Sequence, residues 1–220
     1  MAPEEQVLVV ERKVVEQIGM FQGLVFDVKR YLDAIFVPGV PRFMPRSQVE
    51  QDPSYKQLIP YVIMTHDGKY LSYVRGKRAG ETRLVAKRSV GIGGHINPID
   101  AEYGPLFAYM YDNYLTAVQR EVAEEVAVEA THKDRIVALL NDESNEVGSV
   151  HLGIVHYWAL DAPKVNKREQ MITQMAFMTS AELLEVKDTL ETWSGLCAEH
   201  LADMENRRKS ALQVDTSSER

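Results

Sequence analysis

Apolar residues recur along the chain at two spacings, and each spacing predicts one kind of element. Runs rich in β-branched and aromatic residues predict strands, and these runs span 7–10, 61–65, 70–74, 84–90, 150–160 and 174–178. Apolar residues three and four positions apart predict helices, and they span 28–35 and 114–130. Because strands and helices interleave, we expect an α+β fold in which helices cover a mixed β-sheet.

A hairpin and a loop stand out between these runs. Asp67-Gly68 is a favoured two-residue turn, so the strands on either side of it should pair antiparallel. Four prolines fall within residues 38–53, and proline restricts the residue before it to extended conformations. We therefore expect a β-hairpin at 61–74 and an extended loop at 38–53.

Capping signals precede the C-terminal helices. Thr179 with Glu182 has the spacing of a capping box and predicts a helix from residue 181. Asp188 with Glu191 repeats the signal and predicts a last helix. The apolar stripe of that helix would be formed by Leu190, Trp193, Cys197, Leu201 and Met204.

The composition is that of an ordinary globular protein. The 220 residues are 45% hydrophobic and 26% charged, with a net charge of -7, and this length is enough to bury a substantial core. The negative charge argues against broad binding to nucleic acid or to anionic membranes. No apolar run reaches the roughly 18 residues of a membrane span. We therefore expect a soluble protein whose partners are neither nucleic acids nor membranes.

Cysteine usage and the N-terminus bear on the compartment. Cys197 is the single cysteine, so no intrachain disulfide can form. The first residues are acidic and lack the basic and apolar regions of a signal peptide. Both observations favour a reducing, cytoplasmic setting.

The segment that points to chemistry is Arg-Glu-Val-Ala-Glu-Glu at 120–125. On a helix, Glu121, Glu124 and Glu125 share one face, because offsets of three and four residues bring side chains together. Three carboxylates on one face repel one another, and a hard divalent cation such as Mg²⁺ would relieve that repulsion. Taken alone, the segment also fits an ordinary solvated helix face with an ion pair between Arg120 and Glu124.

A second segment lies about 25 residues upstream, where a predicted strand ends in Gly-Ile-Gly-Gly-His at 91–95. Alone, two adjacent glycines are more often a turn or a bulge than a site. In this order, and in a strand–loop–helix context, the two segments resemble the signature of the Nudix hydrolase superfamily. That signature is Gly, five residues, Glu, seven residues, then Arg-Glu-apolar-any-Glu-Glu-any-Gly-apolar. The matching residues are Gly94, Arg120, Glu121, Val122, Glu124, Glu125 and Val128.

Three features depart from that signature. Seventeen residues separate Gly94 from Asp112, where the family has five, so the loop at 95–112 carries an insertion of about 12 residues. Asp112, a shorter carboxylate, stands where the family has its first glutamate. Ala127 replaces the late glycine, which is a mild change because alanine suits a helix. We expect the longer loop to reshape access to the substrate.

The resemblance implies a metal-dependent hydrolase that cleaves a diphosphate linkage in a nucleoside diphosphate-X or a related phosphorylated small molecule. The implied cofactor is Mg²⁺ or Mn²⁺, held by Glu121, Glu124 and Glu125, with Asp112 as an accessory ligand. Glu124 or Glu125 would also orient water, and Arg120 would hold a glutamate through a charge-assisted hydrogen bond. Many members of the family are homodimers, so a second copy of the chain is a candidate partner.

Substrate-binding candidates flank the two segments. The backbone at Gly93-Gly94 can approach a phosphate closely because it carries no side chain, and His95 follows directly. Arginine side chains can bind phosphate oxygens through two parallel hydrogen bonds. A basic stretch at 75–88 supplies three such candidates, Arg75, Arg83 and Arg88. The basic stretch also fits a solvated hairpin surface, and a lone histidine is more often a structural hydrogen-bonding residue.

The resemblance covers roughly residues 58–200, with an α/β/α sandwich as the implied architecture. We therefore divide the chain into an N-terminal extension at 1–57, a Nudix-like domain at 58–210 and a disordered tail at 211–220. An acidic loop at 142–146 is either a source of a further base or a solvated turn.

Two other functions stay open. Isopentenyl diphosphate isomerases share this fold, but they require a cysteine near the active-site strand, whereas Cys197 falls on a predicted helix stripe. A nucleotide sensor or binding module would keep the fold without catalysis. Such proteins usually lose glutamates of the signature, and all three are present in this chain.

Overall fold

The helices and strands form two compact units. The computed structural model describes residues 4–76, 87–101, 110–170 and 172–217. The first unit comprises Met1–Tyr61, Gly93–Val122 and Ala138–Ile154, and the second comprises Val62–Ile92, Ala123–Val137 and Val155–Arg220.

The first unit begins with alternating strands and helices. They are β1 (Gln6–Glu11), α1 (Arg12–Gly19), β2 (Gly23–Val25), α2 (Val28–Ile35), β3 (Arg42–Pro45) and α3 (Arg46–Val49). β1 is rich in valine and pairs antiparallel with β3 and with the start of β4 (Tyr55–His66). A small apolar core beside these strands consists of Val7, Val9 and Val49, with Met44 and Tyr55 packed against it.

The remaining elements of the first unit come from the middle of the chain. They are the short 3-10 helix η2 (Pro98–Ala101), α4 (Met110–Glu125) up to residue 122, α5 (Glu146–Ser149), and parts of β9 (His132–Asn141) and β10 (His151–Leu160). β2 pairs antiparallel with the end of β9. Tyr114, Ala117, Val118 and Val122 form the buried side of α4.

The second unit contains the predicted hairpin. β4 and β5 (Lys69–Arg75) pair through Thr65↔Tyr70 and His66↔Lys69. Asp67 and Gly68 both have positive φ, at 47° and 72°, as a type I′ turn requires. The other strands are β6 (Arg88–Ser89), β7 (Gly91–Gly93, whose last residue belongs to the first unit), β8 (Val126–Val128), β11 (Val165–Lys167) and β12 (Ile172–Thr179).

The C-terminal part of the second unit is helical. It contains α6 (Ser180–Glu185), the 3-10 helix η3 (Lys187–Thr189), α7 (Thr192–Ala198) and α8 (Leu201–Ser217). The capping box that starts α6 is confirmed: Thr179 Oγ1 accepts from the amide of Glu182, whose carboxylate accepts from the amide of Thr179.

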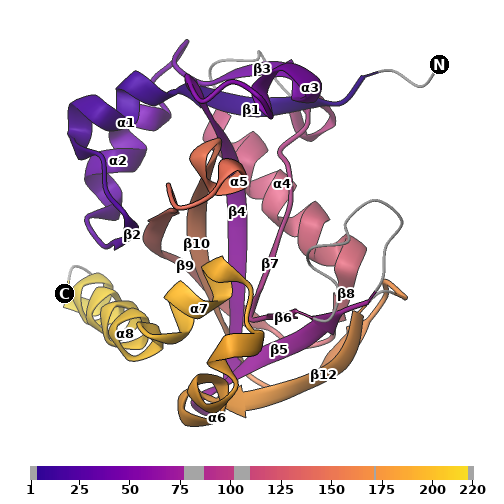
Figure 1. Cartoon of the computed structure of the whole chain (residues 1–220). Helices are drawn as coiled ribbons and strands as arrows, with labels where there is room; N and C mark the ends of the chain where they lie inside the picture. Colours follow the sequence, from indigo (N-terminus) through magenta and orange to yellow (C-terminus); the bar gives the residue numbers. More distant parts are fainter. Residues whose placement is uncertain (1–3, 77–86, 102–109, 171, 218–220) are drawn as a thin grey trace. The chain divides into compact units, whose positions relative to one another are not determined.

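The predicted α+β class with a mixed sheet is confirmed. The strands of the main sheet follow the order β12-β5-β4-β10-β9-β2 (Figure 1). β8 and β11 form a separate pair. No helix among the described ranges is long and apolar enough to cross a membrane.

The helix that carries the glutamates differs from its predicted span of 114–130. α4 runs over Met110–Glu125, and Val126–Val128 instead forms β8, paired with β11. The backbone amides of Arg168 and Glu169 both donate to the carbonyl of Glu125, so the helix ends there. β-branched valines favour a strand once a partner strand is present. The sequence predicted a helix here because Val126 continues the helical spacing of the apolar residues before it. Leu115, which shares the helical spacing of Val118 and Val122, is only half-buried.

Two other stretches were assigned wrongly. The predicted loop at 38–53 contains β3 and α3, and α3 starts directly after Pro45, where a missing amide hydrogen is tolerated. β9 was not predicted, because its first half is polar and only its last five residues are buried.

The predicted last helix is interrupted. Asp188 lies in η3 and caps no helix, and α7 begins after Glu191 without a side-chain cap. The tail predicted at 211–220 is helical as far as Ser217, and residues 218–220 lie outside the described part.

Candidate active site

In the first unit, the carboxylate of Glu121 lies over Gly94. A Cβ built on Gly94 would stand 1.9 Å from Glu121 Oε2 and 2.3 Å from Glu121 Cδ, far inside any van der Waals contact. Arg120 Nη1 donates to Glu121 Oε1 at 2.8 Å, and Arg120 Nη2 donates to the carbonyl oxygen of His95 at 3.0 Å. Gly94 therefore leaves the space that the Glu121 side chain occupies, and Arg120 ties α4 to the end of the glycine segment.

Gly93 has a different constraint. A Cβ on Gly93 would stand 2.3 Å from the carbonyl oxygen of Pro60, which is backbone and cannot rotate away. The glycine at 93 thus permits close packing of β7 on β4, whereas the glycine at 94 makes room for a carboxylate.

His95, a predicted substrate contact, is largely enclosed. Its ring lies 5.7 Å from that of His151, and its Nδ1 is 3.8 Å from Glu5 Oε1. Burial, with the positive charge of Arg46 and the neighbouring His151, lowers the pKa of His95 to about 4. His95 is therefore neutral at physiological pH, and its carbonyl rather than its ring contacts the glutamate motif.

In the second unit, Glu125 is held by two residues of β5. Tyr73 Oη lies 3.3 Å from Glu125 Oε2, and Arg75 Nη1 lies 3.7 Å from Glu125 Oε1. Arg75 also donates through Nε to Glu191 Oε1 at 2.8 Å and through Nη2 to Tyr73 Oη at 3.1 Å. Arg75 thus connects the carboxylate of α4 to a carboxylate at the start of α7.

Of the other predicted site residues, the structure describes the side chains of Glu124 and Arg88. Glu124 is exposed. Arg88 of β6 donates to Ser72 Oγ at 3.1 Å and to Gln174 Oε1 at 3.3 Å, so it lies against β5 and β12. Asp112 belongs to α4, but its side chain lies outside the described part, as does Arg83.

The donor chemistry of the motif fits a divalent cation. Carboxylate oxygens are the ligands that Mg²⁺ and Mn²⁺ favour, and Gly94 provides a cradle that any Cβ would fill. Within the described ranges, no three side chains of His, Cys, Asp or Glu are already gathered around one point. Instead, Glu121 and Glu125, each 14% exposed, have a guanidinium beside them. Two arginines therefore relieve the repulsion that the sequence pattern implied.

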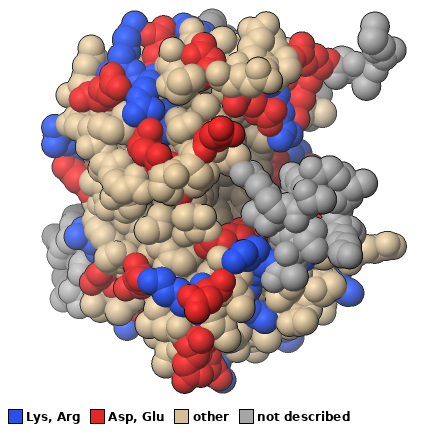
Figure 2. Space-filling view, in the orientation of Figure 1, with Lys and Arg blue, Asp and Glu red and all other residues tan. Residues whose placement is uncertain are grey.

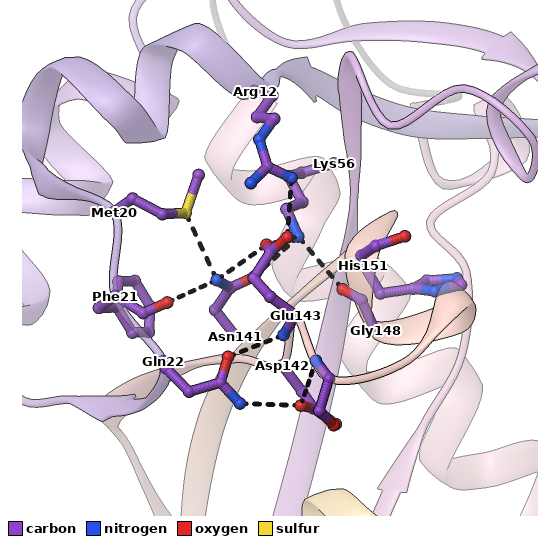
Figure 3. A network of polar contacts seen from close by, with 12 residues as sticks. Arg12, Met20, Phe21, Gln22, Lys56, Asn141, Asp142, Glu143, Gly148 and His151 are labelled. Atoms are coloured by element: carbon purple, nitrogen blue, oxygen red, sulfur yellow. Dashed lines mark hydrogen bonds and ion pairs between the residues drawn. The ribbon is translucent and has the colours of Figure 1, made fainter.

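In the acidic loop at 142–146, Asp142 and Glu143 make hydrogen bonds, whereas Glu146 is exposed. Figure 3 shows Glu143 between two cations: Lys56 Nζ donates to its Oε1 at 2.6 Å and Arg12 Nη1 to its Oε2 at 2.9 Å. Lys56 is fully buried and also donates to Asn141 Oδ1 and to the carbonyl of Gly148. This network fixes the loop between β9 and α5. Lys56 gave no signal in the sequence, because it lies outside the predicted strand at 61–65, next to the polar Gln57 at the start of β4.

In the view of Figure 2, Lys and Arg side chains often lie next to Asp and Glu side chains, while large areas of the surface are uncharged. This arrangement agrees with the many ion pairs in both units, such as Arg46 with Glu5 and Lys187 with Glu199.

Comparison with known proteins gives relatives over most of the chain, although no family model matches it. Protein YmaB of Bacillus subtilis (strain 168) is 31% identical over 201 residues, which cover 87% of this chain and 94% of that protein. The crystal structure of Tm1382, a proposed Nudix hydrolase, is similar with a TM-score of 0.74 and 26% identity, over 91% of this chain and 100% of that chain. DR0079 from Deinococcus radiodurans matches with a TM-score of 0.50 and 15% identity, over 73% of this chain and 91% of that chain. The last likeness shows the fold alone.

Proposed function

The chain belongs to the Nudix hydrolase superfamily, and from this premise we propose that it is a metal-dependent hydrolase of a diphosphate linkage. Its substrate would be a nucleoside diphosphate-X or a related phosphorylated small molecule. The observation that carries the proposal is the fit of Glu121 over Gly94, with Arg120 bound both to that carboxylate and to the His95 carbonyl. A solvated helix face would need neither the missing Cβ nor the link to the glycine segment.

The carboxylates of the motif have proposed roles as metal ligands, and Arg120 has a positioning role. Glu121, Glu124 and Glu125 would hold Mg²⁺ or Mn²⁺, with Asp112 as an accessory ligand. A bound ion would supply positive charge that offsets the phosphate oxygens and acidifies water. Arg120 keeps Glu121 in place through a charge-assisted hydrogen bond.

Other roles follow from the positions of the remaining residues. Glu124 is exposed on α4 and is the carboxylate best placed to orient a water molecule from solvent. The backbone at Gly93-Gly94 can approach a phosphate closely because it lacks side chains.

A binding module without catalysis is the second candidate. Two of the glutamates already have arginine partners, and a protein that only senses a nucleotide could use them as a structural network. The isomerase alternative has less support, because Cys197 is fully buried and burial raises the pKa of its thiol. A buried, protonated thiol is a poor nucleophile.

A substrate panel separates these functions. The purified chain would be incubated with nucleoside triphosphates, sugar nucleotides, dinucleoside polyphosphates, ADP-ribose and non-nucleotide diphosphates, each with and without Mg²⁺ or Mn²⁺. Phosphorus NMR of the products would show which bond is cleaved. Metal-dependent cleavage of one compound is the expected result, and binding without cleavage across the panel would favour the sensor.

The matched variants are Glu124→Gln and Glu129→Gln. We expect Glu124→Gln to lower metal-dependent turnover by about a hundredfold or more. Glu129 is exposed and follows the helix in sequence, so Glu129→Gln should retain normal turnover. Near-normal turnover in Glu124→Gln would contradict the role given to that carboxylate.

A further inference from the structure

We propose that Arg75 is a positioning residue that competes with a divalent cation for Glu125, and that Glu191 sets the strength of this competition. The inference rests on the proposed function, since it takes Glu125 as a metal ligand. It assigns Arg75 to the glutamate motif itself, in place of the diphosphate contact expected from the sequence.

The contacts of Arg75 carry this inference. Its Nε donates to Glu191 Oε1 at 2.8 Å, while its Nη1 is 3.7 Å from Glu125 Oε1. The first distance is a full charge-assisted hydrogen bond, and the second is an ion pair at longer range. The guanidinium is therefore bound more closely to Glu191 than to Glu125, and it is shared between them.

Partial burial strengthens the interactions among the charges of Arg75, Glu125 and Glu191. The side chains of Arg75, Glu125 and Glu191 are 25%, 14% and 12% exposed. Charges that are partly removed from water interact more strongly and are screened less by salt. A change at any one of the three should therefore alter the potential at Glu125.

Tyr73 fixes the geometry of this group. Its ring lies 5.5 Å from Arg75 Cζ, a cation–π distance, and its hydroxyl oxygen accepts from Arg75 Nη2. Tyr73 Oη also lies within hydrogen-bond distance of Glu125 Oε2 and of the Gly91 carbonyl. Only the planar fork of arginine can contact Glu191, Tyr73 and Glu125 from one position.

The consequence is a metal affinity that depends on Glu191. While Glu191 holds the guanidinium, Glu125 keeps much of its negative charge for a cation. If Glu191 is neutralised, the hydrogen bond from Arg75 Nε loses its anionic acceptor, and the guanidinium should interact more strongly with Glu125. Glu191 therefore affects the affinity through Arg75, although it is not itself a proposed ligand.

The test measures Mn²⁺ binding to the purified full chain by electron paramagnetic resonance, at fixed ionic strength and without substrate. Glu191→Gln should weaken binding by about three- to tenfold, and Arg75→Gln should tighten it by a similar factor. The double variant decides between mechanisms, because residues that act through one another are not additive. If Glu191 acts through Arg75, the double variant should lie within about twofold of Arg75→Gln.

Several outcomes would overturn the inference. If Arg75 and Glu191 each affected Mn²⁺ binding only through their own charge, the two substitutions would have opposite effects that cancel. The double variant would then have the wild-type affinity, which would contradict the inference. Equal shifts in the same direction for the two single variants would indicate a merely structural role. Arg75→Lys, which keeps the charge but loses the fork, should give an affinity between wild type and Arg75→Gln. If Arg75→Gln does not fold, Glu191→Gln and Arg75→Lys still test the inference.

An ion pair elsewhere in the same unit provides the control. Lys187 and Glu199 are paired with each other and are about half exposed, so Lys187→Gln and Glu199→Gln should leave Mn²⁺ affinity unchanged. The same measurement tests the proposed function independently of this inference. If the wild-type chain binds no Mn²⁺, the metal assignment is wrong. If it binds Mn²⁺ but Arg75 and Glu191 have no effect on the affinity, only the present inference is wrong.

Discussion

Glu121 and Glu125 stand one helical turn apart on α4 and are equally shielded, yet they are held in different ways. Glu121 is held by Arg120, its neighbour in sequence, and lies over a glycine of the first unit. Glu125 is held by Tyr73 and Arg75 of a strand 50 or more residues earlier in the second unit. The first arrangement is local, and the second depends on the fold. The signature motif therefore describes only half of the environment of its own glutamates.

The largest effects are expected when each of these two carboxylates is neutralised in turn. Glu121→Gln and Glu125→Gln should each lower metal-dependent turnover by about a hundredfold or more, because each would remove a carboxylate that we propose binds the metal. Steady-state kinetics on the substrate found in the panel would measure this. The two sites would prove unequal if one variant kept turnover within about tenfold of wild type.

Gly94→Ala affects only the Glu121 side. The new methyl group would overlap the carboxylate, which must move aside, so turnover should fall by about tenfold to a hundredfold. Stability should change little, because a flexible side chain yields. Gly93→Ala is the matched control, since its methyl group meets the Pro60 carbonyl and should lower the free energy of unfolding by about 2 kcal/mol. Urea unfolding of both variants separates the two effects.

Glu143 is a paired carboxylate outside the motif, so a change there tests the effect of charge pairing alone. Burial opposes its ionisation, but hydrogen bonds from Lys56 and Arg12 outweigh this and lower the pKa of Glu143. Glu143→Gln should reduce the free energy of unfolding by about 2 kcal/mol near pH 7 and leave Mn²⁺ affinity unchanged. A change in Mn²⁺ affinity would show that the loop contributes to the metal site.

The stability that the Glu143 carboxylate contributes should decrease as the pH falls. A carboxylate whose pKa is lowered by folding stabilises the protein above its unfolded pKa of 4.5, and the stabilisation is lost as the pH falls through the folded pKa. Wild type should therefore lose more stability than Glu143→Gln as the pH falls below 4.5 toward the lowered folded pKa. Parallel curves in urea unfolding would contradict the pairing as a source of stability.

The smallest effect is expected for the ion pair between Lys187 and Glu199. Both side chains are about half exposed, and surface pairs contribute little. Glu199→Gln should change the free energy of unfolding by less than about 0.5 kcal/mol, measured by thermal or urea unfolding. A larger loss of unfolding free energy would mean that burial does not determine how much an ion pair in this chain contributes to stability.

Local patterns account for what the sequence predicted. The type I′ turn at Asp67-Gly68 and the capping box at Thr179 depend on residues within one turn of each other, and both are present. The Nudix signature, also local, led to the correct superfamily. Its metal ligands and substrate contacts stay predictions.

Tertiary pairing explains what the sequence did not reveal. The helical spacing of Val126 continues that of α4, but β11 draws 126–128 into a strand. Glu191 has the spacing of a capping residue, yet its carboxylate binds Arg75 on β5. Lys56 lies at the polar start of β4, and its partners lie 85 or more residues away. In each case the deciding partner is distant in the chain, and a single sequence does not identify it.

The early end of α4 has an electrostatic consequence of its own. Because the helix stops at Glu125, its last carbonyl groups and their partial negative charge lie next to the final glutamate of the motif. Arg168 donates to the carbonyl of Ala123 at 2.9 Å, and the amides of Arg168 and Glu169 cover that of Glu125. The helix dipole thus adds to the attraction for a cation at this end, while the segment after β11 limits how much of that field reaches solvent.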